Sequence, residues 1–429
     1  MKIRAQSNRQ GHTIILTLVV CLVLGVVLLG VIKLANTGGQ MTGRSQNWNN
    51  ALPIAEAGIE EALTHLRYSP TNRWENGWNY DTSLVPPKYT KTQTLKDGYY
   101  KVTISTNHDP VIVSRAWLRA PGQKDYSIQR AIQVKTTNQP LFMAGMEGTT
   151  FVKLTKNMRV DSYDSNDPKH SSATGGYNQA TAKDRGDVTS YGGNGSLDIG
   201  GAHVYGHIKT PPETAYALGG GSVGSFSWSG NGVEPGAYEE MPDPDYPPIF
   251  APKPTATAPK GTGAQSGYQY VLGSAIYEVS AIAGSILITG NATLVVDDSI
   301  KFSGKEEIRI KPGGSLKIYM KGQNTSFTGQ GDINPETPAP NLMYFGLPSN
   351  TGIEMTGNSA FNGVIYAPSA QVALKGGGRD GADFTGAIVA ASVIANGHYS
   401  FHFDEATRRL GSRGIFAGSW DELDPNGNF

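Results

Sequence analysis

The strongest constraint on this chain is an apolar run near its N-terminus. Residues 13–32, TIILTLVVCLVLGVVLLGVI, include no charged side chain. As a helix at about 1.5 Å per residue, the run reaches about 30 Å, the thickness of a bilayer's hydrocarbon core. It is longer than the apolar part of a typical signal peptide, and no small-residue cleavage site follows before Lys33. We therefore predict that residues 13–32 span a membrane, with a buried core helix as the alternative.

Positive charges flank this run unequally. Residues 1–11 carry three basic side chains, whereas only Lys33 and Arg44 lie near the far end. Basic residues are enriched on the cytoplasmic side of membrane helices. We therefore expect residues 1–11 in the cytoplasm and the bulk of the chain on the other side of the membrane.

Composition restricts what the rest of the chain can be. The formal net charge is +0, so we expect no nucleic acid partner. The only cysteine, Cys21, lies within the apolar run, so an exported domain would have no internal disulfide. Glycine is frequent, with 54 residues, and charged residues make up only 17%. Together with many short strand-like runs, this predicts a turn-dense, all-β architecture outside the membrane.

The apolar helix is expected to continue into an amphipathic one, so that residues 12–68 are helical after a leader at 1–11. In LPIAEAGIEEALTHLRYSP, apolar and acidic side chains fall on different sides of a helix. Pro53 suits a helix that restarts there and would kink a continuous one, and Pro70 ends the pattern. The apolar positions are Ile54, Ile59, Leu63 and Leu66, and the acidic ones are Glu56, Glu60 and Glu61.

Residues 69–140 are predicted to form a small antiparallel β region. Three strand-like runs, GYYKVTIST, VIVSRAWLRA and YSIQRAIQVKT, are separated by NHDP and PGQKD, which favour turns. Their lengths and spacing indicate a meander that covers the amphipathic helix.

The remaining residues divide into four parts. Residues 141–233 are a Gly/Ser-rich β region, and residues 234–264 are a proline-rich linker expected to run extended over the surface. In residues 265–407, short strands of Ile, Val and Leu alternate with Gly/Asn turns without a strict repeat. This pattern favours an irregular parallel β-helix, with a β-sandwich as the alternative. Residues 408–429 are expected to form a C-terminal tail.

Two glycine motifs match functional patterns without their expected context. Gly220–Gly224 matches the nucleophile pattern G-x-S-x-G, which requires a strand before it and a helix after it. Gly376, Gly378 and Gly381 match G-x-G-x-x-G, but the strand-like ADFTGAIVA follows in place of a helix. We expect no nucleophile in the first motif and a turn in the second.

Three fragments resemble parts of the signature of polygalacturonases, which are β-helix glycosidases with paired carboxylates. They are Asp297-Asp298, Arg309-Ile310-Lys311 and Gly397-His398. In that family the His motif lies between the other two, whereas here it comes last. Adjacent aspartates are also common in tight turns between strands. We therefore expect no glycosidase activity.

Histidine and acidic clusters do not predict a metal site. Residues four apart on a strand, such as His398 and His402, lie about 13 Å apart, which is too far to share an ion. Strand alternation predicts Tyr399, Phe401 and Phe403 in the core, with His398, Ser400, His402 and Asp404 facing outward.

An acidic loop is the remaining possible metal ligand set. Asp161, Asp164 and Asp167 could hold calcium, but no glycine occupies the sharp-turn position of an EF-hand loop. We expect a solvated loop there. Overall, no catalytic, cofactor-binding or metal-binding residue is predicted.

Both ends of the chain resemble known proteins. A basic leader ending at Gly11, an apolar helix and the stretch AEAGIEEAL resemble type IV pilin-like proteins, particularly the PilX-type pilus assembly family. The stretches NGVIYAPSAQVALKGGG, DFTGAIVAASV and GHYSFHFDEA resemble a β-rich domain often fused behind such N-termini. The middle of the chain remains unassigned by this resemblance.

The resemblance implies processing and assembly. A prepilin-type peptidase would cut between Gly11 and His12, and the helix would be retained, first as an anchor and then in a filament's core. One position departs from standard pilins: Leu16 occupies the fifth mature position, where those proteins carry Glu. PilX-like sequences often lack this Glu too. Candidates for pairing with neighbouring subunits are Glu56, Glu60 and Glu61.

Three hypotheses follow. The first is a non-enzymatic, pilus-associated subunit of the bacterial inner membrane or a cell-surface pilus, which displays a β-rich ectodomain for adhesion or assembly. Its partners would be other pilin-like subunits and the pilus assembly machinery. The second is a permanently anchored envelope structural protein that never polymerises. The third is a membrane-tethered β-helix enzyme that acts on glycans.

Overall fold

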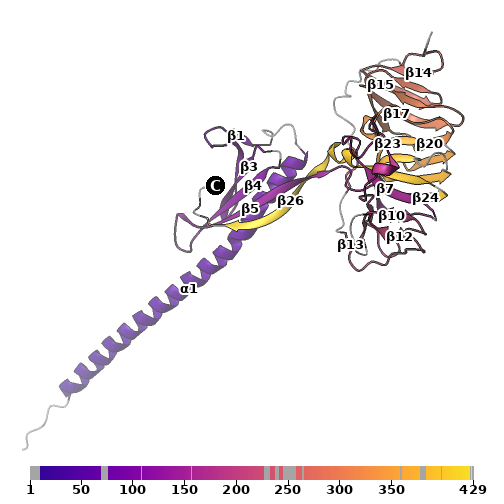
Figure 1. Ribbon diagram of the computed structural model, residues 1–429. Coiled ribbons are helices and arrows are strands. Elements are labelled where there is room, and N and C mark those ends of the chain that lie inside the picture. The colour runs from indigo at the N-terminus through magenta and orange to yellow at the C-terminus, as the bar shows by residue number, and fades with distance from the viewer. Residues whose placement is uncertain are drawn as a thin grey trace, which may run out of the picture. The chain divides into compact units, whose positions relative to one another are not determined.

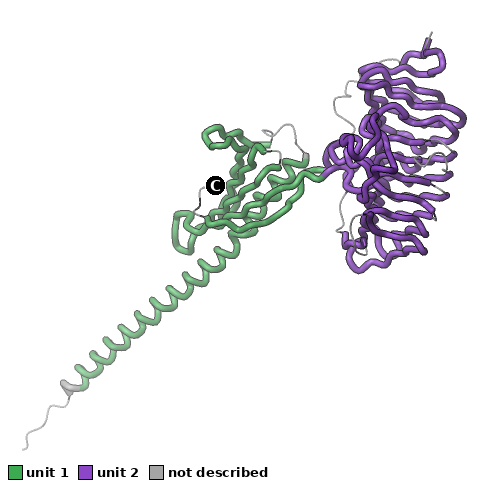
Figure 2. Tube along the Cα trace, in the orientation of Figure 1, with its two compact units in different colours: residues 1–139, 414–429 green, residues 140–413 purple. Residues whose placement is uncertain are grey.

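The computed structural model describes residues 10–68, 76–107, 109–155, 157–226, 232–236, 241–244, 258–262, 265–357, 360–376, 383–397, 399–425 and 427. The chain consists of a long N-terminal helix followed by strands (Figure 1). It divides into two compact units. Unit 1 comprises residues 1–139 and 414–429, and unit 2 comprises residues 140–413 (Figure 2). The predicted mainly β architecture behind an apolar helix is confirmed.

One helix, α1 (Gln10–Tyr68), includes both predicted helical segments. It continues without a break through Pro53 and through the glycines of NTGGQMTGRSQNWNN. The large apolar side chains of residues 14–34 are exposed, as a membrane or protein partner would require. By length and composition, α1 is long and apolar enough to cross a membrane. This apolar helix suggests a membrane anchor or a signal sequence.

The second half of α1 packs on a sheet. Its buried side chains recur at helical spacing and share one hydrophobic cluster with residues of the sheet. Gly58, within AEAGIEEAL, lies so close to the sheet that a Cβ there would approach Ser114 Oγ to 2.3 Å. Any larger residue at this crossing would force the side chains of Ser114 and Tyr100 to shift. The buried helix positions are Ala51, Ala55, Ile59, Ala62 and Leu66.

The sheet of unit 1 has six strands, in the order β1-β2-β3-β4-β5-β26. Strands β1 to β5 pair antiparallel, as predicted for this region. Residues alternate in burial along β3 and β4, so one face of the sheet packs on α1. The strands are β1 (Asn79–Asp81), β2 (Lys88–Thr94), β3 (Gly98–Ser105), β4 (Val111–Arg119), β5 (Tyr126–Pro140) and β26 (Ser412–Leu423).

The C-terminal residues differ from the predicted tail over 408–429. Residues 405–409 form a short 3-10 helix, η5 (Glu405–Arg409), and β26 adds a sixth strand beside β5. Arg130 of β5 binds Glu422 of β26 through two hydrogen bonds of 2.7 and 2.6 Å. Unit 2 is therefore inserted between two neighbouring strands of unit 1.

Unit 2 contains strands that pair in parallel. In its first half these are β6 (Met146–Lys153), β7 (Arg159–Tyr163), β8 (Val188–Ser190), β9 (Leu197–Asp198), β10 (His203–Tyr205), β11 (Ile208–Thr210), β12 (Ser222–Gly224) and β13 (Val233–Pro235). Two further short 3-10 helices are η1 (Gln179–Thr181) and η4 (Ala339–Asn341). The second half contains β14 (Tyr270–Leu272), β15 (Ile276–Ile282), β16 (Ile286–Ile288), β17 (Asn291–Phe302), β18 (Ile308–Ile310), β19 (Ser315–Met320), β20 (Asn324–Gly329), β21 (Leu342–Gly346), β22 (Gly352–Gly357), β23 (Phe361–Gly376), β24 (Phe384–Gly397) and β25 (Ser400–Asp404).

The strands are not stacked in sequence order. One continuous series of parallel pairs runs β15-β17-β19-β21-β23-β24-β6-β8-β11-β13. The chain therefore enters the stack in its interior, at β6, and proceeds to β13 at one end. It resumes at β14 and β15 and returns strand by strand to β24, beside β6. A single hydrophobic cluster includes side chains from both halves.

The predicted linker over 234–264 connects β13 to β14 within unit 2, so it does not separate two domains. Its described parts bond to the stack: Tyr366 donates its hydroxyl to the carbonyl of Pro242 at 2.7 Å, and the Val271 N–H donates to Pro259 at 2.8 Å. Proline suits such an extended path over strands because it needs no ladder partner.

Glycines align at one turn of the stack. Gly329, Gly357, Gly376 and Gly397 are paired in register on four successive strands, and all have positive φ, between 100° and 130°. A Cβ on Gly357 would approach the carbonyl oxygen of Gly329 to 2.3 Å. The turn predicted around Gly376 thus includes this column, whereas Gly378 and Gly381 lie outside the described residues.

The parallel strand pairs of unit 2 also contradict the β-sandwich alternative, whose sheets are antiparallel.

Candidate functional site

The predicted processing and assembly residues lie on α1. Gly11 and His12 are in its first turn, where side chains are not described. Leu16 is 64% exposed on the apolar surface of the helix. Nothing in unit 1 that the structure describes covers this part of α1, so its apolar surface remains available to a membrane or to neighbouring helices.

The three glutamates of α1 have different surroundings. Glu61 binds Lys91 at 2.5 Å and accepts a hydrogen bond from the Tyr100 hydroxyl. Burial and this bond raise the pKa of Tyr100, which keeps the phenol protonated. Glu56 is half-buried, whereas Glu60 is exposed. Glu61 therefore has partners within unit 1, and Glu60 is the most accessible of the three.

The sequences that resemble hydrolase motifs are not assembled into a hydrolase-like site. Ser222 opens β12 and its hydroxyl lies 2.8 Å from His203 Nδ1, its neighbour in the parallel register. The strand continues as Ser222–Gly224 and no helix follows directly, so the nucleophile-elbow context is missing. Neighbouring side chains on paired strands meet in this way without any catalytic role.

The polygalacturonase-like fragments are used in surface ion pairs. Asp297 binds Lys321 at 2.7 Å, on β17 and the residue after β19. Arg309, on β18, binds Glu307 and Glu336 instead, each at 3.0 Å. His398 lies outside the described residues. The fragments therefore do not bring paired carboxylates to a common groove in the part of the chain that is described.

The predicted outward orientation of His402 and Asp404 is wrong. Both side chains are fully buried. His402 Nδ1 contacts the buried Asp161, and its ring stacks on Tyr177 with centroids 3.5 Å apart. The residues between β7 and β8 thus cover this side of β25, which strand alternation alone could not reveal. Phe401 and Phe403 are buried as predicted, and so is Tyr399.

The possible calcium ligands are engaged elsewhere. Asp161 accepts hydrogen bonds from Arg159 and Tyr177, at 2.7 and 2.8 Å, besides its contact with His402. Asp164 and Asp167 accept backbone N–H groups two residues ahead, as aspartates do in turns. No metal-binding cluster of acidic, histidine or cysteine residues occurs among the described residues.

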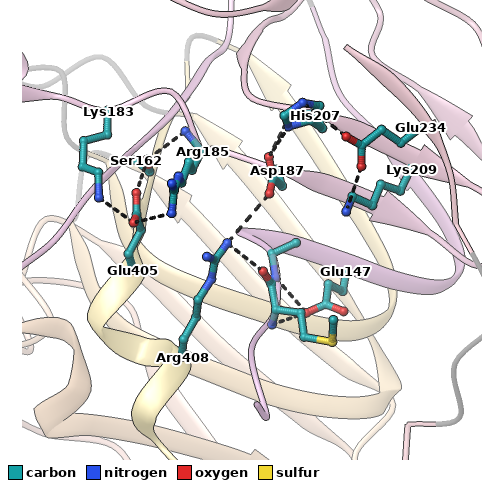
Figure 3. A network of polar contacts seen from close by, with 12 residues as sticks. Glu147, Ser162, Lys183, Arg185, Asp187, His207, Lys209, Glu234, Glu405 and Arg408 are labelled. Carbon is teal, nitrogen blue, oxygen red and sulfur yellow. Dashed lines mark hydrogen bonds and ion pairs between the residues drawn. The ribbon is translucent and has the colours of Figure 1, made fainter. Parts of the chain in front are cut away.

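A polar network of unit 2 arises from the parallel register of β8, β11 and β13. Val188, Ile208 and Val233 are paired with one another and share the core cluster. Their neighbours must then point away from this core, because side chains alternate along a strand. Thr189, Lys209 and Glu234 are paired in register. Asp187 lies beside His207, close to Lys209 and Glu234 (Figure 3).

Acidic and basic side chains follow one another in this network, in the order Asp187, His207, Glu234 and Lys209. His207 lies between two carboxylates, with Nδ1 3.4 Å from Asp187 and Nε2 3.3 Å from Glu234. Lys209 binds Glu234 at 3.0 Å, and this hydrogen bond lowers the pKa of Glu234. Burial raises the pKa of Asp187, although the His207 N–H and nearby cations oppose that effect.

The short helix η5 contributes the other half of the network. Arg408 lies 3.8 Å from Asp187 and donates to the carbonyl of Met143 at 3.1 Å. Glu405 binds Lys183 at 2.6 Å and accepts the Ser162 hydroxyl at 2.9 Å (Figure 3). These contacts therefore connect three segments that are distant in sequence: residue 143, residues 162–187 and residues 405–408.

A buried ion pair lies where the chain enters and leaves unit 2. Arg413 binds Glu147 at 2.6 Å, and both side chains are fully buried. Glu147 also accepts the N–H of Met143 at 2.9 Å and the hydroxyl of Tyr191 at 3.0 Å. Arg413 in turn donates to the carbonyl of Leu141 at 3.1 Å. Each partner of this pair is thus hydrogen-bonded on more than one side, which offsets the cost of burying charge.

A small cleft adjoins this network. It has a volume of about 150 Å³ and is lined in part by Asp187, Thr189, Tyr191 and Lys209. Asp187 contacts His207 and Arg408, Lys209 binds Glu234, and the Tyr191 hydroxyl donates to Glu147 of the buried pair. We interpret the network as structural. Together with the Arg413–Glu147 pair, we call it the structural joint, because it holds together the segments through which the chain enters and leaves unit 2.

Sequence reasoning missed this joint. Glu147 is the only charged residue in MAGMEGTT, and Arg413 is the only charged residue in LGSRGIFAG. An isolated charge of this kind is only a weak signal for a buried ion. Their pairing across 266 residues depends on the order of the strand stack.

Comparison with known proteins identifies one region. A family described as a domain of unknown function (DUF7305) matches residues 286–410, which include β16 to β25 and η5. No curated protein and no solved structure matches the chain. The match covers the second half of unit 2 and excludes α1 and the sheet of unit 1.

Proposed function

We propose that this protein is a non-enzymatic, pilin-like subunit that displays unit 2 from a filament or membrane anchored by α1. The observation that carries the proposal is the dual nature of α1. Its first part exposes a continuous apolar surface, and its second part packs on an antiparallel sheet. A helix of this kind suits burial among lipids first and among neighbouring helices later.

The N-terminal resemblance supports the same function. Type IV pilin-like proteins of the PilX type share the basic leader, the apolar helix and AEAGIEEAL. In unit 1, Gly58 of this stretch permits the close crossing of α1 and β4. Leu16 in place of Glu favours a minor subunit over a major one, with other pilin-like proteins and the assembly machinery as partners.

Unit 2 is the part that we propose to be displayed. We propose that it is an irregular parallel β-helix; this is supported by one series of parallel pairs that connects strand after strand over a single core. Its insertion between β5 and β26 gives it two covalent connections to unit 1, and adhesion or pilus assembly is the role that such a display suits. The ion-paired surface and the absence of a hydrolase-like constellation in the described residues favour a non-enzymatic role.

Intact-mass spectrometry of protein purified from membranes tests the anchor and its processing. We expect a chain that starts at His12 in cells that contain a prepilin-type peptidase, and an uncut chain when Gly11 is replaced by a bulky residue. Recovery of only the uncut wild-type chain would favour the alternative, a permanently anchored envelope protein.

A further inference from the structure

His207 lies between two carboxylates that come from different parts of the strand stack. Its Nδ1 is 3.4 Å from Asp187, which precedes β8, and its Nε2 is 3.3 Å from Glu234 of β13 (Figure 3). A neutral imidazole has one N–H to donate, whereas an imidazolium donates from both ring nitrogens. Only the doubly protonated ring can therefore donate to both carboxylates at once.

The charged groups that face His207 come from every element packed around it. Besides Asp187 and Glu234, they are Lys209 of β11, which binds Glu234 at 3.0 Å, and Arg408 of η5, which lies 3.8 Å from Asp187. Burial raises the pKa of Asp187, and a positive charge on His207 opposes that effect. The bond from Lys209 lowers the pKa of Glu234, and the same charge on His207 adds to it. Both carboxylates are thus coupled to the charge of one ring.

The strand that His207 contacts is attached to the stack by few backbone bonds. β13 lies at one end of the series of parallel pairs and has three residues, of which Pro235 has no N–H. The N–H of Ile208 donates to Gly232 at 2.8 Å, and the N–H of Gly236 donates to Thr210 at 2.6 Å. A short strand of this kind depends strongly on its side-chain contacts.

We propose that His207 is a pH-sensitive latch that holds β13 on β11. When the ring carries two protons, it connects Asp187 to Glu234. When it gives up one proton, it can donate to only one of them, and Glu234 then depends on Lys209. Histidine side chains change charge between about pH 5 and 8. The stabilisation is therefore present at low pH and is lost as pH rises.

The latch has a consequence for the end of the stack. A loosened β13 uncovers the edge of β11, and an open strand edge can pair with another strand. The residues involved belong to unit 2 alone. The latch therefore goes beyond the proposed display function and does not depend on whether α1 enters a filament.

Amide hydrogen exchange of the full-length protein in detergent, from about pH 5 to 8, tests the latch. The exchange of peptides that contain β11 and β13 is divided at each pH by that of the same peptides unfolded. We expect the protection of β13 to fall about two- to fivefold as pH rises, the range of an exposed ion pair. His207→Gln should abolish this change, because glutamine does not titrate.

A second histidine provides the matched control. His203 of β10 is exposed, and its Nδ1 lies 2.8 Å from the Ser222 hydroxyl. His203→Gln should keep the wild-type change, together with the pH effects of all other groups. Glu234→Gln should reduce the change, because one of the two carboxylates no longer carries a charge, and it tests the latch even if His207→Gln does not fold.

Three results would overturn the latch. The first is a wild-type protection of β13 that stays constant or rises with pH. The second is a change of wild-type size in His207→Gln, which would assign the pH dependence to other groups such as Asp187. The third is a change of wild-type size in Glu234→Gln, which would show that the contact with β13 does not carry the effect.

Discussion

The buried pair of Arg413 and Glu147 offers the sharpest test of how unit 2 is closed. In Arg413→Met, the Met side chain fills much of the volume of the Arg stem but leaves the Glu147 carboxylate buried without its cation. Breaking a fully buried pair on one side costs about 3–5 kcal/mol of the free energy of unfolding. We expect a loss in that range, because both side chains have no exposed surface and the pair distance is 2.6 Å.

Amide hydrogen exchange of the full-length protein in detergent measures this loss where it occurs. Peptides from β6 and β24, which are paired in the interior of the stack, should lose protection, whereas β3 and β4 of unit 1 should not. Glu354→Gln is the matched control, because its pair with Lys375 spans 2.8 Å but is half exposed and should contribute at most about 1 kcal/mol. Adding Glu147→Gln to Arg413→Met should recover part of the loss, since no charge then remains buried. A loss for Arg413→Met no larger than that of the control would refute the reasoning.

Three further predictions concern the fold. Gly357→Ala should lower the free energy of unfolding by about 1–3 kcal/mol in urea titrations, because its φ is 104° and a Cβ would clash with the Gly329 carbonyl; an unchanged midpoint would contradict the glycine column. Burial raises the pKa of Asp404 to about 6, above its usual value of 3.8, so this group makes unit 2 less stable as pH rises from about 4 to 6. Asp404→Asn should abolish that part of the pH dependence in parallel urea titrations, and identical profiles for both proteins would count against it. Replacing residues 140–413 by an Asn-Gly turn should leave unit 1 folded, as judged by circular dichroism, since β5 and β26 are neighbours in its sheet; an unfolded product would show that unit 1 depends on unit 2.

Local patterns predicted much of this molecule. The absence of charge over residues 13–32 predicted the helix, because an apolar run of this length is rarely anything but a helix. Alternating apolar and polar residues between turn-favouring segments predicted β3, β4 and β5. The recurring Gly turns correctly indicated parallel, turn-dense strands in residues 265–407. Each of these features depends on neighbours within a few residues.

Long-range pairing could not be predicted in the same way. Nothing local in residues 408–429 indicates that β26 joins β5, or that β24 lies beside β6. His402 is buried, against the prediction that it faces solvent, because its contacts are remote in sequence: Asp161 is 241 positions away, and Tyr177 stacks on its ring. The structural joint around Glu147 and Arg413 could not be predicted either, because these two residues are 266 positions apart. The assignment of Glu56, Glu60 and Glu61 to assembly stays a prediction.

The central claim, that α1 carries this protein into a filament, is tested most directly by shearing surface filaments from cells that express the pilus machinery. Immunodetection of unit 2 should find the chain in the sheared fraction, and mass spectrometry of that fraction should show that the chain begins at His12. Its amount should fall when a charged residue replaces Leu24 in the exposed apolar surface of α1. A chain found only in the membrane fraction, with Met1 intact and with the rest of the pilus present in the sheared fraction, would contradict the account.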